Sequence, residues 1–179
     1  MKKKDRYQQV LAYFKEHKPI VGTELQFGSA FQLLCATLLS AQCTDKRINE
    51  VTPALFRRYP TSGEMAQAEP EDIYEYIRSV SYPNAKSRHL VEMARMIESD
   101  YDGVLPSDPK ELVKLPGVGR KTANVLMAVW FGKAAMAVDT HVFRVAHRLG
   151  LVPKTANTPL KVELCLMRDI PREDIPNAH

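Results

Sequence analysis

Apolar residues recur at helical spacing along most of the chain, and this pattern restricts the fold more than any other feature of the sequence. The i, i+3, i+4, i+7 spacing of one helix face occurs in Tyr7, Val10, Leu11 and Phe14, and again in Leu90, Met93, Ala94 and Ile97. Around residues 31–39 the apolar side chains nearly encircle the helix axis, which predicts a buried central helix. No segment alternates with period two for long enough to predict a strand. We therefore predict an all-α fold.

The ends of the expected helices are marked by capping residues and glycines. Ser107-Asp108-Pro109 places a capping side chain before a first-turn proline, and Thr158-Pro159 repeats the arrangement. Gly103, Gly132 and Gly150 each stand where a periodic segment stops, as glycines at helix C-termini do. The twelve prolines fall between the periodic segments, so we expect many short helices joined by tight connections.

The composition narrows the class of protein without naming a function. A net charge of +4 permits an anionic partner but does not require one. The three cysteines, Cys35, Cys43 and Cys165, form no CxxC pair and leave an odd count, which argues against a secreted disulfide framework. The start of the chain has no apolar segment typical of a signal peptide, and residues 31–41 are too short to span a bilayer. We expect a soluble, cytoplasmic protein that does not bind membranes.

Residues 107–131 predict a helix–hairpin–helix. A helix that begins near Pro109 is expected to run into Leu115-Pro116, and a second helix to continue to Phe131 after the hairpin. The glycines of the hairpin allow unusual backbone conformations and close approach of a ligand. The first amides of the second helix lack partners within that helix and lie at its positive end, which favours a DNA phosphate. The expected DNA-binding residues are Gly117, Val118, Gly119, Arg120 and Thr122.

Two other glycine motifs do not fit this segment. A mononucleotide P-loop needs lysine directly after its last glycine, and Arg120 separates Gly119 from Lys121. The dinucleotide-binding motif needs a third glycine where Thr122 stands, and a strand before it. An ordinary turn between two helices, with a glycine at the C-cap, remains the alternative to a DNA-binding hairpin.

Three segments together carry a resemblance to a known family. Residues 115–124 (LPGVGRKTAN), 137–145 (AVDTHVFRV) and 38–45 (LLSAQCTD) resemble endonuclease III, with Cys43 where alanine or threonine is usual. The resemblance extends from near the start of the chain to its last residue. It implies a two-domain helical DNA glycosylase fold with a helix–hairpin–helix, acting on double-stranded DNA that contains a damaged base or an abasic site. We expect a monomer associated with DNA in a bacterial-type cytoplasm.

Lys121 is the expected nucleophile. A lysine amine becomes reactive where its surroundings disfavour the ammonium form, as the first turn of a helix beside Arg120 does. The resemblance implies attack of this amine on the sugar C1′, displacement of an oxidised pyrimidine, a Schiff base and strand cleavage by β-elimination. Similar adenine-mismatch glycosylases generally carry serine here, so lysine favours the glycosylase/lyase. The alternatives are a non-catalytic DNA-binding module, in which Lys121 only contacts phosphate, and a mismatch adenine glycosylase.

Asp139 is the second expected catalytic residue. It precedes an amphipathic helix, so it is also a favourable N-cap. A helix from Lys121 to Phe131 carries the chain away by about 15 Å. Residues 132–139, if extended, can return it by about 23 Å. The resemblance implies that Asp139 assists the nucleophile and stabilises the cationic transition state.

The resemblance also implies that two side chains fill the gap left by an extruded base. Gln42 matches the glutamine of the Ser-Ala-Gln motif, and Tyr82 stands where the apolar wedge of a second loop is usual. Ser81 replaces the usual glycine of that loop, which leaves the opposite-base preference open. We expect Asp45 to be a helix cap, and Asp139-x-His141 has no third residue that would complete a metal site.

Members of the family usually end with four cysteines, spaced C-x6-C-x2-C-x5-C, that hold a [4Fe–4S] cluster. The three cysteines of this chain lack that spacing, and we expect no metal ligand in it. We expect a truncated chain whose longer form holds the cluster. The expected domains are residues 23–133, intact, and an incomplete domain made of residues 1–22 and 134–179.

Overall fold

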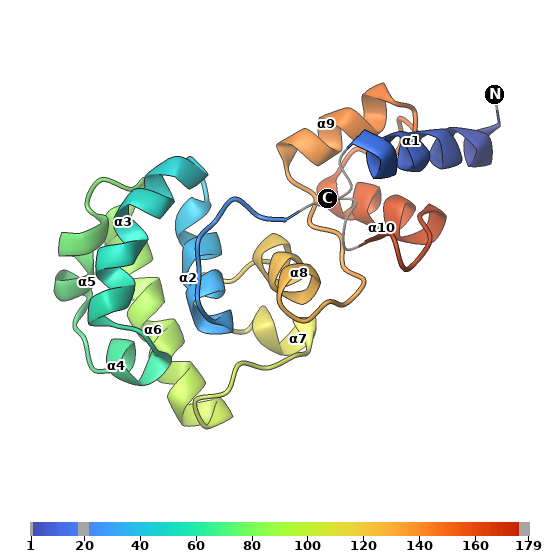
Figure 1. Ribbon diagram of the computed structural model, residues 1–179. Helices are drawn as coiled ribbons and strands as arrows, with labels where there is room; N and C mark the ends of the chain where they lie inside the picture. Colours follow the sequence, from blue (N-terminus) through green and yellow to red (C-terminus); the bar gives the residue numbers. More distant parts are fainter. Residues whose placement is uncertain (1, 18–21, 176–179) are drawn as a thin grey trace. The chain divides into compact units, whose positions relative to one another are not determined.

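The computed structural model describes residues 2–17 and 22–175, and within these ranges it contains ten α-helices and no strand (Figure 1). The predicted all-α fold is thereby confirmed. The chain divides into two compact units: unit 1 comprises Met1–Thr23 and Met127–His179, and unit 2 comprises Glu24–Leu126. The boundaries expected from the sequence, at 22/23 and 133/134, stay a prediction for the domains.

Unit 2 is built around a buried helix. Its helices are α2 (Ala30–Ser40), α3 (Asp45–Arg58), α4 (Ser62–Ala66), α5 (Pro70–Ile77), α6 (Pro83–Tyr101), α7 (Pro109–Leu112) and α8 (Arg120–Val129). The last three residues of α8 fall within unit 1. Helix α6 packs against α2, α4 and α5, while α3 packs against α2 and α5 (Figure 1). Residues 33–39 of α2 are all buried, which confirms the buried central helix expected from the apolar side chains around its axis.

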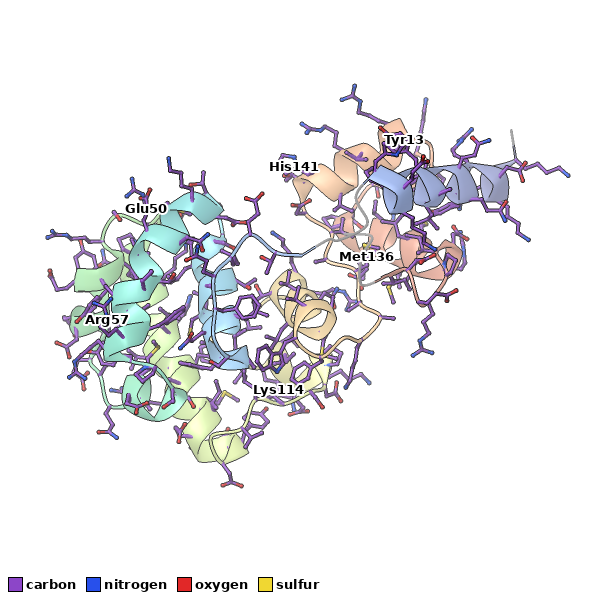
Figure 2. All side chains as sticks on the ribbon, viewed as in Figure 1. Tyr13, Glu50, Arg57, Lys114, Met136 and His141 are labelled. Carbon is purple, nitrogen blue, oxygen red and sulfur yellow. The ribbon has the colours of Figure 1, made fainter. Side chains whose placement is uncertain are left out.

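Unit 1 has a core of its own. It contains α1 (Lys3–His17), α9 (Thr140–Arg148) and α10 (Pro159–Asp169). The fully buried Met136, labelled in Figure 2, belongs to this core, as do Val162 and Leu166 of α10. Two hydrogen bonds attach α1 to the turn after α9: Arg6 donates to the Gly150 carbonyl at 2.8 Å, and the Tyr7 hydroxyl to the Leu151 carbonyl at 2.9 Å.

The expected helix ends are largely confirmed. Asp108 and Thr158 are N-caps, whose side chains accept from the Lys110 and Lys161 amides. Gly103, Gly132 and Gly150 have φ of +75°, +60° and +63°, the left-handed conformation of C-terminal glycines.

Two helices end earlier than expected. Helix α7 stops at Leu112, and the amides of Lys114 and Leu115 form the i→i−3 hydrogen bonds of turns, to Glu111 and Leu112. The physical reason is Pro116, whose ring disfavours helical backbone at the residue before it. Helix α8 ends at Val129 because the chain turns through Gly132, and the Lys133 amide bonds back to the Met127 carbonyl.

None of the described helices has both the length and the apolar character needed to cross a lipid bilayer.

Charged side chains tie α1 to the end of α10, and this contact predicts a pH-dependent stability. Arg168 donates to both Asp169 oxygens at 2.9 Å, and Lys3 Nζ lies 2.5 Å from Oδ2. These bonds, chiefly those from Arg168, lower the pKa of Asp169 to about 2. A carboxyl whose pKa is lower in the folded state stabilises that state above its unfolded pKa, near 4, and loses this effect as the pH falls toward 2.

We expect Asp169→Asn to lower the free energy of unfolding by about 1 kcal/mol at pH 7, a partly exposed pair being worth little more. The difference from the unsubstituted protein should close between pH 4 and pH 2. Urea unfolding at several pH values measures it, with the exposed Asp5 changed to asparagine as the control. A difference that is the same at pH 7 and pH 2 would contradict the assignment.

Candidate functional site

The turn between α7 and α8 is anchored in unit 2 by buried apolar side chains. Leu112, Leu115 and Val118 are buried, and the Val118 amide donates to the Leu115 carbonyl at 3.0 Å. Gly117 has φ of +76°, and a Cβ at this position would lie 2.9 Å from both His89 Cβ and Leu38 Cδ1. The turn therefore lies against α6 and α2, and only glycine fits at position 117.

The second glycine of the turn behaves differently from the first. We expected unusual backbone at both, but Gly119 is not in the left-handed region. A Cβ at Gly119 would meet no atom within 4 Å. Gly117 is thus required by the fold, whereas Gly119 presents exposed backbone with open space around it.

Lys121 is exposed in the first turn of α8, directly after this turn. Arg120 precedes it, also exposed, and Thr122 follows. The helix is fixed in unit 2 by the buried side chains of Ala123 and Leu126. Lys121 therefore stands on a firmly held helix N-terminus, with its side chain accessible to a large substrate.

A carboxylate that we had expected to be a helix cap belongs to the surroundings of Lys121. Thr44, not Asp45, caps α3, and its Oγ1 accepts from the Arg47 amide at 3.3 Å. Burial raises the pKa of Asp45, the neighbouring Glu24 carboxylate raises it further, and the positive charge of Lys121 lowers it. Asp45 and Lys121 therefore interact electrostatically within unit 2.

Gln42 and Tyr82 lie on two loops that meet. Both are exposed, and both have left-handed backbone, with φ of 56° and 54°. The residue before each one takes part in the contact, because the Ser81 hydroxyl donates to the Ala41 carbonyl at 3.1 Å. The two side chains that we expected to fill the gap in a duplex are thus presented from adjoining loops.

Lys86 joins the same two loops and was not expected from the sequence. Its Nζ donates to the carbonyls of Leu39 and Ala41, at 2.8 and 2.7 Å, and to Ser81 Oγ at 3.1 Å. The sequence does contain a signal for it. Lys86 lies four residues before Leu90, on the apolar face of α6, where a lysine is buried only when it has partners.

Asp139 belongs to unit 1, whereas Lys121 belongs to unit 2. Asp139 is half-buried and caps α9, since its Oδ1 accepts from the Val142 amide at 2.7 Å. The expected capping role is confirmed. One carboxylate oxygen, Oδ1, makes this bond, and the group is fixed at the start of the helix.

The cysteines do not supply the ligands of an iron–sulfur cluster. Such a cluster needs four thiolates, and the chain has three cysteines, all of them free. Cys35 is in unit 2 and Cys165 in unit 1, and burial raises the pKa of Cys35, which favours the neutral thiol. Across residues 2–17 and 22–175, no three His, Cys, Asp or Glu side chains come together as a metal site.

Comparison with known proteins identifies relatives across the whole chain. Residues 35–172 match the model of the HhH-GPD superfamily base excision DNA repair proteins. The chain is 43% identical to endonuclease III of Synechocystis sp. over 176 residues, which is 98% of this chain and 80% of that protein. It is 44% identical to endonuclease III of Bacillus subtilis over 161 residues, 90% of this chain and 73% of that protein.

Solved structures agree with the sequence comparison. A trapped endonuclease III–DNA covalent intermediate, with an estranged adenine, matches 100% of this chain and 84% of its own, with a TM-score of 0.94 and 41% identity. A non-covalent endonuclease III–DNA complex matches with the same TM-score and 40% identity, covering 100% of this chain and 83% of that one. A thermostable thymine-DNA glycosylase, 21% identical with a TM-score of 0.80, covering 98% of this chain and 83% of that one, shares the fold.

Proposed function

Because the chain belongs to the endonuclease III family of the HhH-GPD base excision DNA repair proteins, we propose that it is a DNA glycosylase that removes oxidised pyrimidines and then cuts the abasic strand. The observation that carries this proposal is Lys121, an exposed amine at the N-terminus of α8, directly after the turn at Gly117–Gly119. The substrate is double-stranded DNA, and the place of action is the cytoplasm.

The turn binds the DNA backbone. Helix N-terminal amides attract phosphate because they carry partial positive charge and lack partners within the helix. The open space at Gly119 lets a phosphate approach the backbone there. Arg120 and Thr122, in the first turn of α8, add a positive charge and a hydroxyl donor. Val118 is buried and holds the turn in place. None of these contacts depends on base sequence.

Lys121 carries out the covalent chemistry. The damaged nucleotide is first extruded from the duplex, and Gln42 and Tyr82 occupy the gap. The Nζ lone pair then forms a bond to C1′ as the bond from C1′ to the base breaks, and the proton that Nζ loses is balanced by the proton that the departing base takes up. Opening of the sugar gives a Schiff base. Loss of a C2′ proton and breakage of the C3′–O bond cut the strand, and water releases Lys121.

Asp139 and Asp45 act electrostatically and form no covalent bond with the substrate. Asp139 is held by its bond to the Val142 amide, as a fixed carboxylate must be to stabilise positive charge on the sugar. The carboxylate of Asp45 interacts with the positive charge of Lys121 in unit 2, and we assign it an electrostatic role beside the nucleophile.

The test of the proposed function is a duplex that carries one oxidised pyrimidine, such as thymine glycol. We expect this protein alone both to release the oxidised base and to cleave the DNA strand at that position. Release without cleavage would remove the lyase step from the proposal. Binding with neither product would identify a DNA-binding module.

Salt provides an independent prediction about the turn. If phosphate contacts supply most of the affinity for undamaged duplex, binding releases counterions, and log K should fall linearly with log salt by about 0.9 per phosphate neutralised. Fluorescence anisotropy between low and moderate salt measures this slope. Affinity that is independent of salt would contradict the role of the turn.

A further inference from the structure

Lys86 is a buried lysine whose bonds lead to no carboxylate. It is 6% exposed, in the first turn of α6, and burial lowers its pKa. The groups that accept from its Nζ are two carbonyls, Leu39 and Ala41, and the Ser81 hydroxyl. An ammonium has three donors, and these three acceptors satisfy them. Burying an ammonium costs free energy, so the presence of a lysine at this position calls for a role beyond filling space.

The carbonyls that Lys86 binds belong to the end of α2. The last carbonyls of a helix have no partner within it and lie at its negative end. The ammonium takes the place of both missing partners, and hydrogen bonds from a charged donor are stronger than neutral ones. Lys86 thereby fixes the last turn of α2, including Ala41, against the start of α6.

The third acceptor extends the contact to the second loop. Ser81 accepts from Lys86 and donates to the Ala41 carbonyl, so three groups form one closed set of bonds. Ser81 stands where the family usually has glycine, and its hydroxyl makes this closure. The set joins residues that are 40 positions apart in the sequence.

In each loop, the residue that follows the one bonded to Lys86 has a strained backbone. Gln42 follows Ala41 and Tyr82 follows Ser81, and both have left-handed backbone that L-residues avoid. Such conformations persist only where the surroundings enforce them. Both residues are exposed, and Tyr82 is 65% exposed. The strain therefore falls on the two side chains assigned to the gap in the duplex.

We propose that Lys86 is a positioning residue that holds Gln42 and Tyr82 together as one rigid wedge, so that both enter the duplex in a single step. This inference rests on the proposed function. Lys86 does not touch the DNA or the reacting atoms; it acts through Ala41 and Ser81. Without its ammonium the two loops would move separately, and entry into the duplex would require ordering each of them.

The first test uses the free protein and needs no activity. Lys86→Met keeps the aliphatic stem and removes the three bonds. Amide hydrogen exchange should accelerate about tenfold or more at residues 41–43 and 81–82, as locally strained segments relax, and stay unchanged in α4 and α5. Ser81→Ala, which leaves the two carbonyl bonds in place, should give a smaller change at the same amides. Unchanged exchange in both variants would overturn the proposal.

The second test measures entry into DNA. The duplex carries a tetrahydrofuran abasic analogue, which cannot form a Schiff base, opposite 2-aminopurine, whose fluorescence rises on unstacking. The unsubstituted protein should raise it, and Lys86→Met should need about tenfold more protein for the same rise, while its affinity for undamaged duplex stays within a factor of about two. Should Lys86→Met fail to fold, Ser81→Ala carries the same comparison with a smaller shift.

A mutant cycle that combines Lys86→Met with substitutions of Gln42 and Tyr82 distinguishes a positioning role of Lys86 from a general effect on stability. In a Gln42→Ala, Tyr82→Ala background, Lys86→Met should have no further effect on the fluorescence, because there is nothing left to position. An additive effect would show that Lys86 acts elsewhere and would overturn the inference. If the unsubstituted protein neither binds the duplex nor raises the fluorescence, the proposed function fails, and the role of Lys86 in DNA fails with it. Hydrogen exchange in the free protein needs no DNA, so it shows separately whether Lys86 holds the two loops.

Discussion

Replacing Lys121 with glutamine should abolish strand cleavage at abasic sites. Glutamine keeps a polar side chain that is one atom shorter, and it carries an amide in place of the amine, so neither the bond to C1′ nor the Schiff base can form. Loss of a covalent nucleophile in other enzymes lowers the rate by on the order of 10⁴ to 10⁶, and we expect a loss of that order here. Cleavage of an abasic duplex, measured in a single turnover, gives the comparison.

The matched control is Lys114→Gln. Lys114 lies in the turn after α7 with its side chain 57% exposed, and it is paired with Glu111 at 2.7 Å (Figure 2). The substitution removes the same charge from the same segment without touching the proposed nucleophile. Lys114→Gln should keep its cleavage rate, and both variants should still bind undamaged duplex. Equal loss of cleavage in the two would show that charge, not the Lys121 amine, is what matters.

Gly117→Ala should destabilise the protein far more than the same substitution at Gly119. The left-handed backbone at Gly117 costs an alanine about 1–2 kcal/mol. The added Cβ would lie 2.9 Å from His89 Cβ and Leu38 Cδ1, and relieving such a clash in a packed core costs a further 1–3 kcal/mol or so. We therefore expect the free energy of unfolding to fall by about 2–5 kcal/mol, measured by urea unfolding.

Gly119→Ala is the natural comparison for this prediction. Its backbone is not left-handed and its Cβ would meet no neighbour, so stability should change by only about 0.5 kcal/mol. The effect should appear in DNA affinity instead, because the methyl group occupies the space through which a phosphate approaches. Equal losses of stability in the two variants would contradict the structural role of Gly117 and the open surroundings of Gly119.

The helices could be predicted because their signals are local. The apolar surround of α2 and the apolar face of α6 are each visible within a few turns of sequence. The caps at Asp108, Asp139 and Thr158 need only the residues beside them. The early end of α7 was missed, although Pro116 was in view, because the apolar pattern continues through Leu115.

The site was less predictable where it depends on contacts between distant segments. Lys121 and the turn were found because they are consecutive in sequence. Asp45 was taken for a cap, since nothing local shows that α3 begins beside Lys121. Lys86 was passed over because its partners, Leu39 and Ala41, are more than forty residues away. The left-handed backbone of Tyr82 was equally hidden, because a residue before proline usually prefers extended backbone.

The most direct measurement of the central claim is to locate the covalent bond. The chain is incubated with duplex DNA that contains one abasic site, in the presence of borohydride, which reduces a Schiff base to a stable amine. The adduct is digested and the modified peptide is sequenced by mass spectrometry. The proposed mechanism requires the sugar on Lys121, in the peptide that follows Gly117-Val118-Gly119. A sugar on any other amine, or no adduct at all, would contradict it.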